Sequence, residues 1–204
     1  MSVRRLVPGL GPDSFEFTPE NQEWAQKQIA KYPAGRQQSA VIPLLDQAQR
    51  QMDGWLPEAA VRYVADYLDM PYIRVYEVAT FYTMFNLKPV GKVHVQVCGT
   101  TPCWLRGAED LKEVCRRKMG VDKDQGPSED GTYSWTEMEC LGACVNAPMI
   151  QVDDETYEDL TVERFEALLD ELAKDKSAPK TGPQIDRQFS APAGGPTVLK
   201  KGDA

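Results

Sequence analysis

The sequence contains a single histidine, His94, and this scarcity excludes two common kinds of metal site. A Rieske centre and a Cys2His2 zinc site each need two histidine ligands. Apolar runs are short, and none approaches the roughly 18–20 residues that a membrane-spanning helix needs. Neither a G-x-G-x-x-G motif nor a P-loop occurs, so we expect nucleotide and flavin to be bound by another chain.

Basic charge is also in short supply, because the formal net charge is −8 at pH 7. General nucleic-acid binding needs a basic face, so we expect no nucleic-acid partner. The N-terminal residues MSVRRLVPGLGPDSF lack the apolar stretch of a secretory signal and become acidic too early for a transit peptide. An odd number of cysteines, five, without an export signal argues against a disulfide framework and favours a reducing compartment.

Four of those cysteines form two close pairs. Cys98 and Cys103 lie in VCGTTPC, and Cys140 and Cys144 lie in ECLGAC. Each short spacing lets one pair bind one metal atom, so four thiolates can satisfy the two irons of a 2Fe–2S cluster. The same four could close a tetrahedral zinc site, and the spacing alone leaves both metals possible.

The remaining cysteine and the histidine are predicted to be structural. Cys115 lies on an apolar helical stripe and should pack in the core. That stripe also contains Leu105, Ala108, Leu111 and Met119. His94 alternates with strand valines, so we expect a hydrogen-bonded structural side chain rather than a catalytic base.

The first half of the chain has helical periodicity. After an N-terminal extension, residues 1–17, Thr18 and Pro19 are typical of a helix start. Further helices are expected over 41–52, from Pro57, and over 72–85, where aromatic side chains should pack between helices. Residues 18–88 are therefore predicted to form a small helical bundle.

From Lys92 the period changes to that of a strand, with a strand over 93–98 that ends at Cys98. A helix over 101–119, strands over 133–139, 149–152 and 156–158, and a helix from Thr161 should follow. This β-α-β-β-β-α order predicts a thioredoxin-like domain over 89–176, and an α+β fold for the chain. The tail, 177–204, should be either disordered or laid across a partner.

Two segments closely resemble the small 2Fe–2S subunit of respiratory complex I, the NADH:quinone oxidoreductase. They are VYEVATFYTMFNLKPVGKVHVQVCGTTPCWLRGAEDL and ECLGACVNAPMIQVDDETYEDLT, and the resemblance runs from about Thr18 to Leu172. It implies a helical domain followed by a thioredoxin-like ferredoxin domain. The family's four cluster ligands match Cys98, Cys103, Cys140 and Cys144, whereas Cys115 matches none of them.

The resemblance also implies partners and a location. A flavin-binding NADH-oxidising subunit would hold FMN and NADH, and the large iron–sulfur subunit would lie in the same complex. The chain would be bacterial, attached peripherally to the cytoplasmic side of the inner membrane through that complex. Two alternatives stay open: a diaphorase subunit of an NAD-linked hydrogenase or formate dehydrogenase, and a structural zinc module that mediates assembly.

Overall fold

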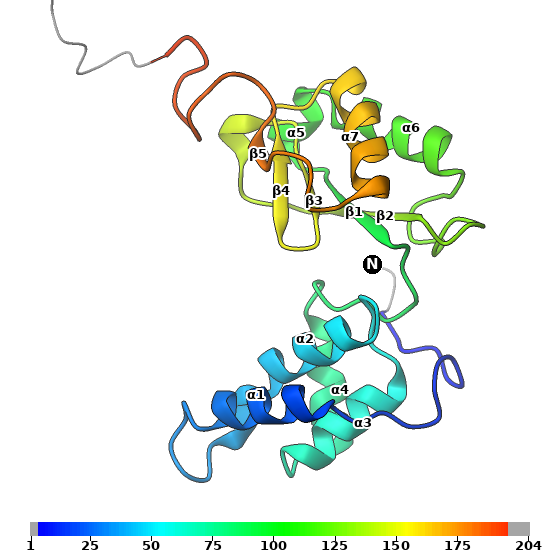
Figure 1. Ribbon diagram of the computed structural model, residues 1–204, viewed down its shortest axis with the longest axis vertical. Helices are drawn as coiled ribbons and strands as arrows, with labels where there is room; N and C mark the ends of the chain where they lie inside the picture. The colour runs from blue at the N-terminus through cyan, green and yellow to red at the C-terminus, as the bar shows by residue number, and fades with distance from the viewer. Residues whose placement is uncertain (1–3, 196–204) are drawn as a thin grey trace, which may run out of the picture. The chain divides into compact units, whose positions relative to one another are not determined.

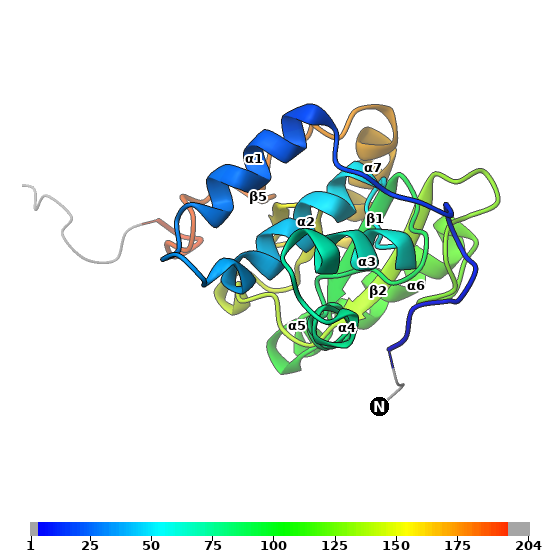
Figure 2. The same ribbon diagram turned by 90° about the horizontal axis from the view of Figure 1, so that it is seen from below.

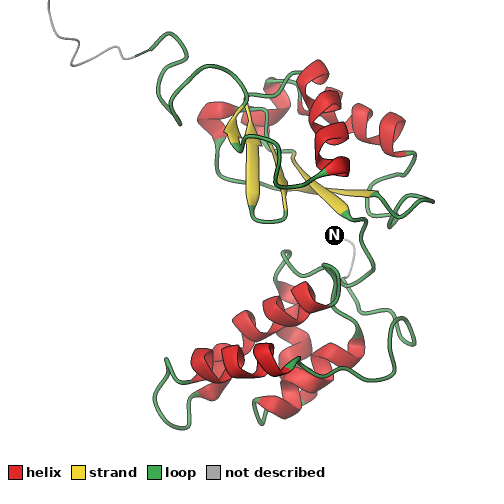
Figure 3. Ribbon diagram, viewed as in Figure 1, coloured by secondary structure: helices red, strands yellow, loops and turns green. Residues whose placement is uncertain are grey.

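The computed structural model describes residues 4–195. Within them the chain separates into two compact units, with the division after Val90. The first unit is built from helices, and the strands lie in the second (Figure 3). The α+β class predicted from the sequence is confirmed.

The N-terminal unit is the predicted helical bundle. Its elements are α1 (Pro19–Ile29), the 3-10 helix η1 (Gln37–Ala40), α2 (Val41–Gln51), α3 (Glu58–Tyr67) and α4 (Tyr72–Phe81). As predicted, Thr18 caps α1, because its hydroxyl accepts a 3.3 Å hydrogen bond from the amide nitrogen of Asn21. α1 and α2 lie side by side in both views (Figures 1 and 2).

The last helix of the bundle is shorter than predicted. It ends at Phe81, because Tyr82 has an extended backbone with φ −81° and ψ 122°. Phe85 still reaches the core from the segment after the helix, and Tyr72 and Tyr76 pack against that core. Phe81, by contrast, is 77% exposed, so the expectation of interhelical packing fails for this aromatic residue.

The segment before α1, expected only as an extension, packs against the bundle. Leu6, Phe15 and Phe17 are buried in its core. The Arg4 guanidinium donates a 2.6 Å hydrogen bond to the carbonyl oxygen of Tyr82. Residues 4–17 therefore belong to the folded first unit.

The second unit is built on a five-stranded mixed sheet. Its strands are β1 (Val93–Cys98), β2 (Tyr133–Met138), β3 (Ile150–Val152), β4 (Glu155–Glu158) and β5 (Gly182–Pro183). They lie in the order β2-β1-β3-β4-β5, with β1 parallel to β2 and antiparallel to β3. β1 is thus an interior strand. Its last residue, Cys98, lies at the end of the sheet where the parallel strands β1 and β2 both finish.

Two helices, α6 (Ala108–Met119) and α7 (Val162–Lys174), cover one face of this sheet (Figure 1). The core lies between them and the strands. It includes Val93, Val95, Val97, Leu111, Cys115, Trp135, Phe165 and Leu168. The alternation of β1 residues therefore places the valines against the helices, as the sequence predicts.

The predicted single helix over 101–119 is wrong, because the structure divides it into α5 (Thr101–Leu105) and α6. Gly107 lies between them with a φ of +102°, a conformation that residues with a Cβ rarely adopt. The break turns Leu105 off the predicted apolar stripe, so it is 69% exposed. Ala108, Cys115 and the rest of the stripe are buried as predicted.

Up to residue 195, the tail folds onto its own unit. Gly182 and Pro183 form β5, which pairs in parallel with β4. Further along, Arg187 and Asp159 form an ion pair in which both side chains are less than a tenth exposed. These contacts join residues far apart in the chain, and no local sequence pattern predicts them. Residues 196–204 of the predicted tail lie outside the described residues.

Candidate metal centre

The first cysteine pair spans the end of β1 and the start of α5. Cys98 is the last residue of β1, and Cys103 lies in the first turn of α5. Both side chains are about 1% exposed, and both belong to the same buried cluster. Burial and the nearby Cys98 raise the pKa of the Cys103 thiol to about 12. This pair is held inside the protein.

The second pair follows β2 and is exposed. Cys140 comes shortly after the strand, and Cys144 begins the 3-10 helix η2 (Cys144–Asn146). Their Sγ atoms lie 4.0 Å apart. Two sulfurs bound to one tetrahedral metal at about 2.3 Å would lie about 3.8 Å apart, so this spacing fits a shared metal atom. Between them Gly142 has a positive φ of +89°, a backbone conformation that glycine adopts readily.

Packing brings the two loops together. Leu141 and Ala143, which lie between Cys140 and Cys144, pack against a buried cluster that contains Cys98 and Cys103. Although burial opposes it, hydrogen bonding from the backbone of Leu141 and from Thr100 lowers the pKa of the Cys98 thiol. All four predicted ligand residues therefore gather at one edge of the sheet, with one pair buried and the other open to solvent.

This arrangement suits a group with two metal atoms. Each iron of a 2Fe–2S cluster takes two cysteine sulfurs, and the structure supplies two such pairs. The donor set, four cysteines in two pairs, fits the cluster that the sequence suggests.

Two further groups at the site were missed by the sequence analysis. The Thr100 hydroxyl lies 3.6 Å from the Cys98 Sγ, and hydrogen bonding from the backbone of Leu141 lowers the pKa of the same thiol. A hydroxyl two residues after a cysteine is a weak signal that could have indicated the first. A backbone N–H carries no sequence signal, because every residue except proline has one.

Cys115 is buried in the core and His94 is hydrogen-bonded through Nδ1, as the sequence predicts. Cys115 is fully buried on α6, and this burial raises the pKa of its thiol. His94 Nδ1 lies 2.8 Å from the Ser134 hydroxyl on the neighbouring strand. Burial lowers the pKa of His94 to about 4, so the imidazole is neutral at neutral pH.

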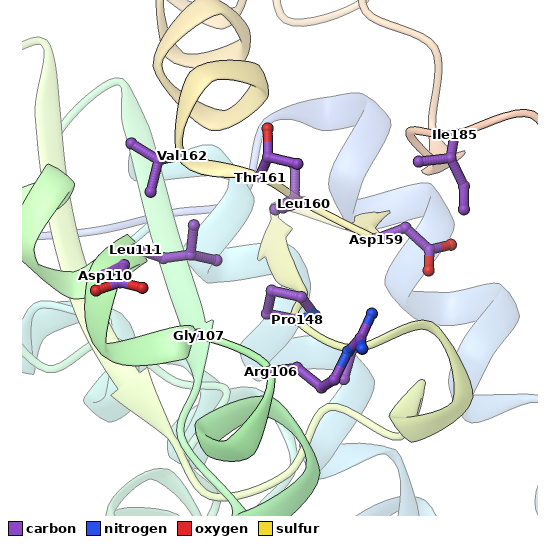
Figure 4. A pocket seen from close by; sticks show the side chains of 11 residues that line it. Arg106, Gly107, Asp110, Leu111, Pro148, Asp159, Leu160, Thr161, Val162 and Ile185 are labelled. Atoms are coloured by element: carbon purple, nitrogen blue, oxygen red, sulfur yellow. The ribbon is translucent and has the colours of Figure 1, made fainter.

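A cavity of about 330 Å³ borders the cysteine-bearing segments without containing a cysteine. Arg106 and Gly107, just after α5, line one side of it (Figure 4). Pro148, which follows η2, and Thr161, which precedes α7, also line it. The cysteines therefore converge outside this cavity, and a cluster held by them would not occupy it.

The mixed sheet, the two covering helices and the cysteine-bearing edge define the class of protein, a thioredoxin-like ferredoxin. The chain belongs to the thioredoxin-like [2Fe-2S] ferredoxin family, whose model matches residues 25–173. As a member of this family, the protein holds one 2Fe–2S cluster.

Curated relatives are similar over most of the chain. The NADH-quinone oxidoreductase subunit designated E 1 in Rhizobium meliloti (strain 1021) is 56% identical over 203 residues, which are 98% of this chain and 73% of that protein. The NADH-quinone oxidoreductase subunit designated E in Rickettsia bellii (strain RML369-C) is 57% identical over 162 residues, 79% of this chain and 96% of that protein. Both relatives are named as subunits of an oxidoreductase.

Among solved structures, the chain is similar to an NAD+-reducing [NiFe]-hydrogenase in the H2-reduced state, with a TM-score of 0.60 and 16% identity. The match covers 69% of this chain and 24% of the hydrogenase chain. The air-oxidised form gives a TM-score of 0.55 at 18% identity. At such low identity, the likeness shows a shared fold alone.

Proposed function

We propose that this chain is the electron-transfer subunit of the NADH-dehydrogenase module of respiratory complex I. Cys98, Cys103, Cys140 and Cys144 are the ligands of its 2Fe–2S cluster. The observation that carries this assignment is the meeting of the two cysteine loops, where Leu141 and Ala143 of the second loop pack against the buried cluster of Cys98 and Cys103. The naming of relatives at 56% and 57% identity supports the parent complex.

The chain's own residues hold and orient the cluster. The buried pair fixes one side of the site, and the exposed pair leaves the other side open toward a partner. When bound, the cluster supplies reversible one-electron transfer. Hydride from NADH needs a two-electron acceptor, so FMN and NADH belong to a flavin-binding partner subunit.

In this proposal the flavin-binding subunit and the large iron–sulfur subunit are the neighbours of the chain in the complex. The complex is associated with a membrane, and we place this subunit on the cytoplasmic side of a bacterial inner membrane. Across residues 4–195, no helix is long and apolar enough to cross a bilayer.

Four single Cys→Ser variants test the ligand assignment, with Cys115→Ser as the matched control. Each of the four ligand variants should lose or strongly shift the visible spectrum, while the wild type should contain iron and sulfide in equal amounts. Cys115→Ser should keep the spectrum, at a stability cost of about 1 kcal/mol for a hydroxyl on a packed face. A folded but bleached Cys115→Ser protein, or a colourless wild type that contains zinc, would refute the assignment.

The shared fold of the hydrogenase chains keeps one second candidate, a diaphorase subunit of an NAD-linked hydrogenase. Affinity purification of the tagged chain from its native host separates the two. The complex I assignment predicts recovery of a flavin subunit together with quinone-reducing subunits. Recovery of a nickel-containing hydrogenase subunit instead would favour the diaphorase.

A further inference from the structure

The carboxylate of Glu137 lies against the backbone of the first ligand loop. Glu137 is on β2, opposite Val97 in the parallel pairing with β1. A Cβ atom built on Gly99 would lie under 3.0 Å from Oε1 of Glu137, closer than real Cβ atoms come to any neighbour. Since Gly99 separates Cys98 from Thr100, the carboxylate contacts the segment that carries one ligand and the hydroxyl beside it.

Two lysines hold this carboxylate in place. Lys112 on α6 donates to Oε1 of Glu137, and its ammonium group also lies 2.6 Å from a carboxylate oxygen of Glu109. Lys123 donates to the other oxygen of Glu137 over 3.2 Å. The Lys112 hydrogen bond lowers the pKa of Glu137, so the carboxylate is ionised at neutral pH.

Burial makes this ion pair electrostatically effective. The Lys112 side chain is only 6% exposed, although lysine is among the residues least often buried. Water and salt screen a buried charge much less than an exposed one. Glu137, at 31% exposure, is also partly shielded from solvent. Glu137 and Lys112 are thus the two least exposed charges of this cluster, since Glu109 and Lys123 are about half exposed.

We propose that the Glu137–Lys112 ion pair sets the reduction potential of the 2Fe–2S cluster. This inference rests on the proposed function, because it takes Cys98 and Cys103 as ligands. Reduction adds one electron to the site, so a nearby carboxylate disfavours the reduced state and a nearby ammonium group favours it. Charges and hydrogen bonds around the ligands are a known means of adjusting a metal site.

Gly99 also contributes to the position of the Glu137 carboxylate. Any side chain at this position would push the Glu137 carboxylate away from the loop, since the two cannot occupy the same space. Gly99 is therefore a positioning residue: its missing Cβ lets the charge approach the ligand loop. Its role lies in this close approach, because its φ is not positive.

Potentiometric titration of the intact protein, followed by the visible spectrum and by the resonance signal of the reduced cluster, tests the proposal. Glu137→Gln should raise the midpoint potential, and Lys112→Met should lower it. Lys112→Arg, which retains the positive charge, should stay near the wild-type value. The control is Glu113→Gln, which makes the same charge change in an exposed pair with Arg116 on α6 and should leave the potential unchanged.

Opposite shifts are the decisive readout, because a merely structural role would not change sign with the charge removed. If Lys112→Met does not fold, Glu137→Gln and Lys112→Arg still decide the matter. A Glu137→Gln potential equal to that of the wild type would overturn the proposal. A wild type without any 2Fe–2S signal would refute the proposed function itself, so the two failures are distinguishable.

A double-mutant cycle tests Gly99 separately. Gly99→Ala should lower the free energy of unfolding and raise the potential, because it displaces the carboxylate. Adding Glu137→Ala should recover part of the stability, since the smaller side chain frees the space that the new methyl group needs. Strictly additive losses of stability would show that Gly99 and Glu137 do not act on each other.

Discussion

The side-chain amide of Asn146 donates a 3.1 Å hydrogen bond to the carbonyl oxygen of Phe189. Asn146 is the last residue of η2, the element that begins at Cys144, and its side chain is buried. The backbone N–H of Asp159 also donates to the Asn146 carbonyl over 2.7 Å. The C-terminal segment around Phe189 is therefore hydrogen-bonded to η2, the 3-10 helix that begins at Cys144.

We expect the buried ion pair between Arg187, in this segment, and Asp159 to stabilise the second unit. Arg187→Met leaves the Asp159 carboxylate without its partner, at a site where that side chain is only 9% exposed. Isolating one charge of a buried pair costs about 3 kcal/mol, so the free energy of unfolding should fall by that amount. Denaturant titration followed by circular dichroism measures it.

The control is Arg74→Met, because Arg74 and Glu77 form a pair whose side chains are both more than half exposed. Loss of an exposed pair should change stability by less than about 1 kcal/mol. Truncation after Lys180 should also destabilise the unit, since it removes β5 as well as Arg187. A chain that ends at Gly195 keeps these contacts. Equal stability of all these chains would show that the tail contributes nothing.

The sequence predicts the elements of this fold better than the contacts between them. Strand alternation around Val95 and the cap at Thr18 are local patterns, and both are confirmed. The ion pair of Asp159 and Arg187 joins residues 28 positions apart, so no local pattern could reveal it. The break at Gly107 was missed because a single glycine within a helical stripe is compatible with a continuous helix.

The site shows the same division. Residue type and spacing were enough to single out four cysteines and to set Cys115 apart, because metal chemistry needs those donors in close pairs. Which pair would be buried depends on the surrounding sheet and helices, and so does the packing of Leu141 against the cluster of Cys98 and Cys103. The approach of Glu137 to Gly99 depends on strand register, which only the folded sheet defines.

Acid should destabilise the protein through His94. Burial holds the pKa of this imidazole at about 4, against an ordinary value of 6.5, so between these values the unfolded chain binds more protons than the folded one. Stability is then fully present above about pH 6.5 and is lost as the pH falls toward 4. The loss should reach about 3 kcal/mol, at 1.4 kcal/mol for each unit of pKa difference.

Denaturant titrations at a series of pH values, on the wild type and on His94→Gln, measure this effect. The wild-type curve should fall more steeply between pH 6.5 and 4 than the variant curve, because glutamine does not titrate. Asp124 and Asp153 raise the pKa of His94 and Lys176 lowers it, so salt should alter the size of the difference. Parallel curves would mean that His94 has the same pKa in the folded and the unfolded chain, and would contradict the prediction.

The turn at Gly107 should matter to the cluster as well as to the fold. A Cβ at a φ of +102° costs about 1 to 2 kcal/mol, so Gly107→Ala should lower the free energy of unfolding by that amount. Gly107 also sets the direction of α5, which carries Cys103. Gly107→Ala should therefore alter the visible spectrum or speed the loss of the cluster to an iron chelator.

Gly120→Ala is the matched control for this variant. Gly107 precedes α6, and Gly120 follows the other end of that helix with a φ of +67°. A Cβ at Gly120 meets no neighbour within 4 Å. It should share the stability loss and keep the cluster as firmly as the wild type. If both variants release iron at the same rate, general destabilisation explains the effect, and the orientation of α5 does not.

The isolated chain should not oxidise NADH. Hydride transfer needs a two-electron acceptor, whereas a 2Fe–2S cluster takes one electron at a time, and the sequence has no recognisable nucleotide cradle. The assay follows NADH absorbance with ferricyanide as acceptor, first on the pure chain and then after addition of the flavin-binding subunit. Activity should come with that subunit, and NADH should then bleach the cluster spectrum of this chain.

A Cys140→Ser chain in the same mixture should leave ferricyanide reduction by the flavin subunit intact while abolishing the bleaching. Stoichiometric FMN or NADH oxidation in the pure chain alone would contradict this division of labour.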